Sequence, residues 1–181
     1  MNEILTLLCI VAVAWGIVIF NLLVRDKHRV RAAWSDVDVQ LKRRHDLIPK
    51  LVDAVQAYAG YETRVFERLT QLRAQAEGAA DPAAKGQLES ALGGGMQRLL
   101  AVAEAYPDLK ASAQYVNLMQ QLTEVENHIQ YARRYYNGAV RNLNVRIESF
   151  PDLLIARAFA FRQARLFELE SVTERHPPGK P

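Results

Sequence analysis

One uncharged apolar run near the N-terminus limits what this chain can fold into more than any other feature. The run extends from Ile4 to Val24, which is 21 residues, and none of its side chains is charged. A helix of that length rises about 30 Å, which matches the hydrocarbon core of a bilayer. The run therefore predicts a transmembrane anchor over residues 1–24.

A cleaved secretory signal is the competing interpretation of this run, and two features oppose it. Residues 1–3 contain no Lys or Arg, and the only small-x-small cleavage site, at residues 12–14, lies inside the run. Cleavage there would leave residues 15–24, still largely apolar, at the new N-terminus. A lipidated Cys9 is also disfavoured, because Leu8 stands where a small residue is needed. Cys9 is therefore expected to face the bilayer.

A basic segment follows the anchor directly and indicates the orientation of the chain. Residues 25–50 hold 8 Lys and Arg against 4 Asp and Glu, whereas residues 51–181 hold 15 of each. Positive charge beside a span marks the cytoplasmic side, so we expect the N-terminus outside and the C-terminal body in the cytoplasm. Within this juxtamembrane neck, residues 25–33, four basic side chains are predicted to contact anionic membrane lipid. They are Arg25, Lys27, Arg29 and Arg31.

Beyond the neck, apolar residues recur at the spacing of amphipathic helices. Residues 34–170 therefore predict an all-α fold, in which the N-terminal transmembrane helix is followed by an up-and-down four-helix bundle. The four helices are expected over about residues 34–77, 82–105, 108–147 and 152–170. Residues 171–181 are polar and contain three prolines, so a disordered tail is predicted there.

Prolines and glycines predict where these helices begin, end or bend. Pro49 is expected to kink the first helix or to restart it near Asp46, with Asp46 as the N-cap. Asp81 before Pro82 is a strong start signal for the second helix. The run Gly93–Gly95 predicts either a loose stretch of helix or a close approach by another backbone.

The predicted helices differ in length, and this difference suggests self-association. The first helix is much longer than the fourth, which would leave its membrane-proximal part uncovered. The stripe formed by Trp34, Val37 and Leu41 is then expected to expose an apolar patch near the membrane. Such a patch predicts either a homo-oligomer joined through the neck or burial of the stripe in the headgroup layer.

Four blocks of sequence resemble the signature blocks of the LemA family. In order, they are WSDVDVQLKRRHDLIP (34–49), AYPDLK (105–110), ENHIQYARRYYN (126–137) and IESFP (147–151). The resemblance covers nearly the whole chain, including the anchor. It implies a protein of the bacterial inner (cytoplasmic) membrane, with one span and a four-helix bundle, and no established reaction or cofactor. The chain departs from the family pattern at Leu153, where asparagine is usual, and at Ala160, which replaces a usual glycine.

The histidines and carboxylates form few of the groupings that catalysis or metal binding needs. Asp46 follows His45, and adjacent residues on a helix point about 100° apart, so Asp46 cannot readily orient the His45 ring. His45 is therefore expected to be a residue of the helix surface. Glu124 and His128 are four residues apart, whereas di-iron bundles use Glu-x-x-His twice. No catalytic residue, metal ligand or cofactor is therefore predicted, and the chain is expected not to be an enzyme.

The arginines and tyrosines of the blocks allow two interpretations. The arginine pairs at 43–44 and 133–134 are expected to reach water or to pair with acidic residues of neighbouring helices, and the tyrosines to pack in the core. The acidic candidates are Asp36, Asp38, Glu124 and Glu126. The functional alternative is an anion or peptide groove formed by Arg44, Arg133, Arg134, Tyr135, Tyr136 and Asn137.

These features together predict a membrane-anchored cytoplasmic bundle that acts by interaction, as a non-enzymatic scaffold or adaptor. Its expected partners are membrane lipid, further copies of itself and an unidentified membrane or cytoplasmic protein. The alternative is a lipid-binding or membrane-organising module that acts through self-assembly. Nucleic acid is not an expected partner, because the basic cluster lacks interleaved aromatic residues and the formal net charge is only +3.

Overall fold

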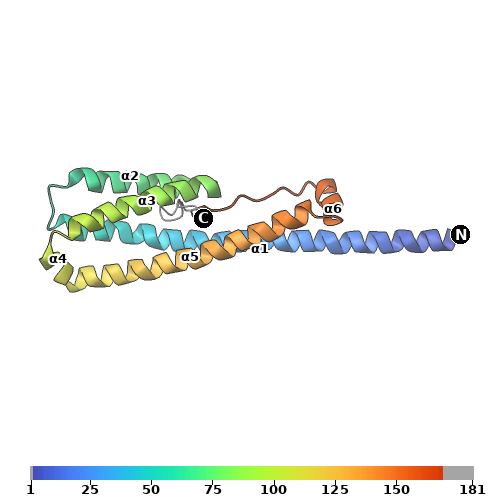
Figure 1. The fold of residues 1–181 in the computed structure, drawn as a ribbon, viewed down its shortest axis with the longest axis horizontal. Helices are drawn as coiled ribbons and strands as arrows, with labels where there is room; N and C mark the ends of the chain where they lie inside the picture. Colours follow the sequence, from blue (N-terminus) through green and yellow to red (C-terminus); the bar gives the residue numbers. More distant parts are fainter. Residues whose placement is uncertain (1, 169–181) are drawn as a thin grey trace, which may run out of the picture. The chain divides into compact units, whose positions relative to one another are not determined.

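The computed structural model describes residues 2–168, and every regular element among them is a helix (Figure 1). The all-α class expected from the sequence is confirmed. The elements are α1 (Asn2–Gln56), α2 (Thr63–Gly78), α3 (Pro82–Ala103), α4 (Pro107–Ala111), α5 (Ala113–Glu148) and α6 (Asp152–Ala158). The tail predicted for residues 171–181 lies outside the described residues.

The chain divides into two compact units, and α1 and α5 each contribute to both. We call residues 2–36 and 134–165 the anchor unit, and residues 37–133 and 166–168 the bundle unit. Each unit is built from segments that are far apart in sequence, so neither corresponds to one continuous stretch of the chain.

The bundle unit contains four long helical segments that share one apolar core. They are the second part of α1, all of α2 and α3, and the first part of α5, and the short connections between them make consecutive helices antiparallel (Figure 1). Each helix buries the apolar stripe that its periodicity predicts. The most buried of these side chains include Val37, Leu41, Ile48, Val55, Leu69, Leu92, Leu99 and Ile129.

Two of these buried side chains correct the prediction of an exposed apolar patch near the membrane. Val37 is 0% exposed and Leu41 is 1% exposed, and Trp34 is half-buried. The stripe is therefore covered by the chain's own helices. Both α3 and α5 contact this part of α1, through the pairs Lys85–Asp38 and Arg44–Glu126. The patch that suggested self-association does not exist in the described structure.

Pro49 does not restart the helix near Asp46, so that part of the prediction is wrong. α1 continues through Pro49 to Gln56, and the chain turns at residues 57–62 instead. A proline inside a helix costs about 3 kcal/mol through a lost hydrogen bond and a clash. Here the flanking residues Ile48 and Leu51 are 1% and 3% exposed, and the burial of such side chains offsets that cost.

Short side-chain caps set two of the other helix boundaries. Asp81 caps α3 as expected, with its carboxylate accepting a hydrogen bond from Ala84 N at 3.1 Å. The third predicted helix is divided at Ser112, whose hydroxyl oxygen accepts from Tyr115 N at 3.3 Å. The residues before Ser112 form the separate short helix α4.

The predicted fourth helix ends about ten residues early, which corrects the boundary at residue 170. α6 stops at Ala158 because Ala160 adopts φ 54°, in the left-handed region. Two hydrogen bonds close the end, from Phe161 N to Ala156 O (2.9 Å) and from Ala160 N to Arg157 O (3.2 Å). This is a Schellman motif, a helix ending that usually has glycine at the left-handed position.

The anchor unit holds α6 and the segment after it against α1 and α5. Asn144 forms two hydrogen bonds of 2.9 Å with the backbone of Ala164, and the rings of Trp34 and Tyr136 are 5.2 Å apart. At its N-terminal end, α1 is long and apolar enough to cross a membrane, by length and composition. Large apolar side chains between Ile4 and Val18 are more than half exposed.

Candidate functional site

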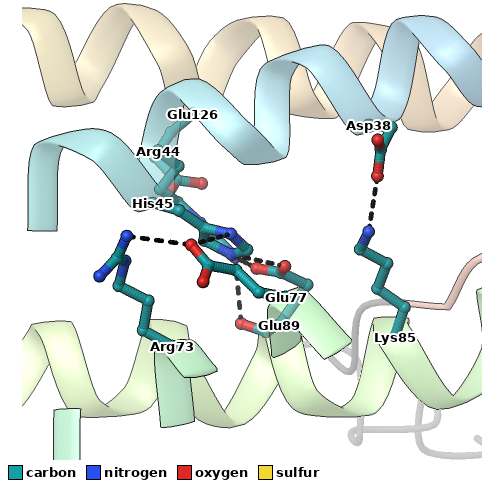
Figure 2. A network of polar contacts seen from close by, with 8 residues as sticks. All are labelled: Asp38, Arg44, His45, Arg73, Glu77, Lys85, Glu89 and Glu126. Carbon is teal, nitrogen blue, oxygen red and sulfur yellow. Dashed lines mark hydrogen bonds and ion pairs between the residues drawn. The ribbon is translucent and has the colours of Figure 1, made fainter. Parts of the chain in front are cut away.

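A network of charged side chains crosses the interior of the bundle unit (Figure 2). Every long helix of that unit contributes to it. α1 supplies Asp38, Arg44 and His45, α2 supplies Arg73 and Glu77, α3 supplies Lys85 and Glu89, and α5 supplies Glu126. Charged residues are rarely buried unless they are paired, so this cluster is the most distinctive polar feature of the bundle.

Glu89 is the centre of the network. Its side chain is 1% exposed, and its carboxylate contacts Arg44 Nη2 on one oxygen and His45 Nε2, at 2.8 Å, on the other. Arg44, 2% exposed, also donates to Glu126 Oε1 at 2.9 Å. One arginine therefore joins α1 to both α3 and α5.

The outer part of the network leads to the surface. Glu77 Oε1 lies 3.7 Å from His45 Nδ1 and 3.0 Å from Arg73 Nη2, and the Glu77 side chain is 46% exposed. On another turn of α1, Asp38 accepts a hydrogen bond from Lys85 Nζ at 2.6 Å. His45 thus lies between a buried and a half-exposed carboxylate.

The charges of the network stabilise one another. Burial alone would raise the pKa of Glu89, but the hydrogen bond from His45 and the positive charge of Arg44 lower it below its usual value. Burial would likewise lower the pKa of Arg44, yet Glu126 and Glu89 outweigh this and raise it. Both groups are therefore held in their charged forms.

This geometry suits alignment of helices better than binding of a metal. Among residues 2–168, no three His, Cys, Asp or Glu side chains are arranged to hold a metal ion. A buried ion pair is costly to desolvate but is satisfied in only one arrangement of the helices, so it disfavours other registers. The network connects α1 to each of the other long helices of the bundle unit.

Comparison with known proteins places these residues in a family. A family model described as the LemA family matches residues 33–179. The chain belongs to the LemA family. The LemA protein of Metamycoplasma hominis is 26% identical over 153 residues, which cover 84% of this chain and 70% of that protein.

Proteins with another name are also related to this LemA family chain. The magnetosome protein MamQ 2 of Paramagnetospirillum magneticum is 26% identical over 175 residues, and the magnetosome protein MamQ of Magnetospirillum gryphiswaldense is 22% identical over the same length. Each match covers 82% of this chain and 64% of the relative. The chain therefore spans just under two thirds of the length of these relatives.

Two of the LemA-like sequence blocks supply the centre of the network. Arg44 and His45 lie in the block at 34–49, and Glu126 begins the block at 126–137. Pairing of Arg44 with Glu126 was one of the interhelical pairs expected from the sequence, and it is confirmed. The expectation that His45 lies on the helix surface is wrong, because its side chain is 3% exposed and contacts Glu89.

The remaining residues of the predicted groove have different environments. Tyr136 is a core aromatic of the anchor unit, 2% exposed, and its hydroxyl donates to Arg165 O at 2.7 Å. Tyr135 is 61% exposed, Arg134 is exposed and Asn137 is half-buried in the same unit. In the bundle unit, Arg133 donates to Gln130 at 3.5 Å. Arg44 faces the core, so it does not line a surface groove.

The four basic neck residues lie on the surface, and among residues 2–168 Glu124 and His128 do not extend into a metal-binding cluster. All four of Arg25, Lys27, Arg29 and Arg31 are exposed. His128 Nε2 is 3.5 Å from Glu124 Oε1 on the surface of α5. Their separation of four residues gives one exposed pair on one helix.

Sequence reasoning missed Glu89, Lys85 and Glu77 as parts of the network. The missed signal is on α3, where Lys85 and Glu89 continue the stripe of Leu92, Met96 and Leu99 at spacings of three and four. A charge on the buried face of a helix needs a partner from another helix. That requirement predicts a buried ion pair, although it does not identify the partner.

Proposed function

We propose that this protein is a single-pass protein of the bacterial inner membrane whose bundle acts as a non-enzymatic scaffold or adaptor. The proposal is supported by the continuity of α1. One 55-residue helix begins with exposed apolar residues and ends in the core of the bundle unit, where Arg44 and His45 fix its position. A bundle that shares a helix with its anchor is suited to hold a partner at the membrane.

The observation that carries a role in binding is a groove on α4 and α5 of the bundle unit. It is an open groove of about 600 Å³, lined by Tyr115, Val116 and Met119, with Lys110 and Glu124 among its polar residues. An apolar groove with charged edges is the kind of surface that receives an amphipathic helix from a partner. We infer that the partner is a protein segment of this kind.

The neck supports the proposed orientation. Its exposed basic side chains follow the apolar run, which favours a cytoplasmic bundle and an N-terminus outside. Confinement of anchors in one membrane also raises their effective concentration, so homo-oligomers remain part of the proposal. Their contact surface would have to be other than the buried stripe at Val37 and Leu41.

Photo-crosslinking in native membranes tests the adaptor role. A photoreactive phenylalanine analogue replaces Met119 in the groove, and in a matched variant it replaces Gln87, an exposed residue of α3. We expect a discrete adduct with one protein from position 119 and none from position 87. Identical adducts from both positions, or none from either, would remove the groove as a partner surface.

A role in membrane organisation is the second candidate, and the exposure of all four neck cations favours it. Full-length protein is reconstituted into vesicles that contain or lack anionic lipid, and vesicle shape is recorded by electron microscopy. The comparison variant has Gln in place of the four neck cations. Deformation that needs both anionic lipid and these cations would support this role, whereas unchanged vesicles would leave the adaptor role as the better account.

A further inference from the structure

Three large apolar side chains are exposed around α6, in the anchor unit. Phe150 is 80% exposed, Leu154 is 59% exposed and Phe159 is 60% exposed. They lie within ten residues of sequence, on α6 and at its two ends. Single exposed apolar residues are common, but a cluster of this size marks a surface that contacts something apolar.

We propose that residues 150–161 are a second membrane-contacting element, which enters the bilayer beside the α1 anchor, in the leaflet on the side of the basic neck. This inference rests on the anchoring proposed above and concerns different residues. It assigns a lipid contact to a segment that follows α5, more than 120 residues after the apolar run.

The first support is continuity with the apolar run of α1. Phe20 contacts Phe159, with ring centroids 4.8 Å apart, and Phe161, with centroids 5.8 Å apart. A methyl group at Gly16 would lie 3.6 Å from Ile155 Cδ1. α6 and the anchor also share an open hollow of about 310 Å³, lined by Val13, Gly16, Ile17, Phe20, Ile155 and Phe159. An apolar hollow of this kind suits a lipid acyl chain.

The second support is the length of the anchor that is free to meet lipid. From Ile4 to Val18, α1 is exposed over 15 residues, which rise only about 22 Å. A bilayer core is about 30 Å thick, so residues 19–24 are needed to complete the span. Ile19 and Leu23 in this stretch are 5% and 0% exposed, and the ring of Phe20 contacts the ring of Phe159. If this stretch lies in hydrocarbon, the side chains packed on it lie there too.

The third support is the placement of charge around the segment. Arg146 pairs with Asp26 at 2.7 Å and with Asp152 at 3.1 Å, so both carboxylates have a cationic partner. Lys27 Nζ lies 5.7 Å from the centroid of the Phe161 ring. Long basic side chains at this level reach the headgroups while their stems stay in the apolar layer. A bilayer that contains anionic lipid fits both the exposed apolar side chains around α6 and these cations.

Spin labels on the full-length protein in vesicles of phosphatidylethanolamine and phosphatidylglycerol test the proposal. One label is placed on the native Cys9, to report on the anchor. In a Cys9→Ala background, the other labels are placed on Leu154→Cys, Phe150→Cys and Tyr135→Cys. Tyr135 is a matched control because it is 61% exposed in the same unit. Its neighbour Tyr136 contacts Trp34, which lies ten residues beyond the apolar run, so Tyr135 is expected to lie outside the bilayer.

Collision rates with oxygen, which enters lipid, and with a water-soluble nickel chelate distinguish the outcomes. We expect oxygen to dominate at Cys9, Leu154 and Phe150, and the chelate to dominate at Tyr135. Chelate dominance at Leu154 with oxygen dominance at Cys9 would overturn the inference while leaving the anchor intact. Chelate dominance at Cys9 as well would instead remove the anchor. Protection from both reagents, with dipolar broadening that grows with protein density, would identify a second copy as the occupant and overturn the lipid contact.

Discussion

Glu89 is a carboxylate held in the bundle core by contacts with Arg44 and His45. Removal of its charge leaves Arg44 without one of its two carboxylates, so Glu89→Gln is expected to lower the free energy of unfolding at pH 7 by about 3–5 kcal/mol. The expected change for Glu124→Gln is within about 0.5 kcal/mol, because Glu124 is 61% exposed. Urea unfolding in mild detergent measures both. Equal midpoints for the two variants would contradict a stabilising role for the network.

Glu89 also determines how the stability of the folded protein changes with pH. Because the folded-state pKa of Glu89 is lowered, its contribution to stability is present above the ordinary glutamate pKa of about 4.3 and is lost as pH falls below it. Protonation of Glu89 weakens its contacts with Arg44 and His45 on α1. Arg44 also contacts Glu126 on α5, and His45 also contacts Glu77 on α2, which pairs with Arg73, so protonation affects the wider network as well. Urea midpoints of wild type and Glu89→Gln should approach each other as the pH falls below the ordinary glutamate pKa. A difference that stays constant as the pH falls would exclude Glu89 as the titrating group.

Ala160 has a backbone conformation that suits glycine better than alanine. The left-handed region costs an alanine about 1–2 kcal/mol, while glycine gains more freedom when the chain unfolds. Ala160→Gly is therefore expected to stabilise the protein by up to about 1 kcal/mol. In Ala158→Gly, at the helical end of α6, the expected change is a loss of about 0.5–1 kcal/mol. Thermal unfolding of the two variants should move in opposite directions, and a lower midpoint for Ala160→Gly would refute the Schellman ending.

At the scale of elements, Gly86 allows the end of the described chain to pack on α3. A methyl group at Gly86 would collide with the backbone carbonyl of Glu168, next to Phe167, which is 0% exposed. Gly86→Ala should therefore displace residues 166–168 and increase their hydrogen exchange. Gly93→Ala is the matched change on the same helix, where nothing lies within 4 Å of the new methyl group, and it should stabilise α3. Unchanged exchange in Gly86→Ala would show that the segment packs elsewhere.

The helix cores supply a second comparison between elements. Leu122 and Ile129 are 6% and 0% exposed on α5, so replacing either with alanine should cost about 2–5 kcal/mol. Gln87 and Arg98 are exposed, and their replacement should change stability by no more than about 0.5 kcal/mol. Similar urea midpoints for the two sets would mean that the faces of α3 and α5 are wrongly assigned.

Local signals predicted some elements well and failed where long-range packing decides. Asp81 with Pro82 identified the start of α3, because a cap and its helix are neighbours in sequence. Pro49 was expected to kink or restart α1, and the restart does not occur, because the burial that offsets the cost of the proline comes from other helices. The end of α6 was missed because its left-handed residue is an alanine, which carries no glycine signal. The Arg44–Glu126 pair was expected, whereas Glu89 was missed, since only the fold brings α3 to Arg44.

The chain as a whole combines an apolar N-terminal run, a basic neck and a bundle aligned by buried ion pairs. The same N-terminal helix that is apolar enough to span a bilayer supplies Arg44 and His45 to the bundle core. The function of the protein is therefore expected to depend on membrane attachment. A variant with lysine at Val11 and Val13, in the exposed part of the run, should leave the membrane fraction, because a charge at the bilayer centre costs several kcal/mol.

Protease protection of a C-terminal tag tests whether the bundle is membrane-anchored and cytoplasmic. The full-length protein is expressed in bacterial cells, which are converted to spheroplasts, and protease is added before or after the membrane is permeabilised. The account predicts a tag that stays with the membrane through an alkaline wash, survives protease on intact spheroplasts and is cut after permeabilisation. A tag cut on intact spheroplasts, or released by the wash, would contradict a membrane-anchored cytoplasmic bundle.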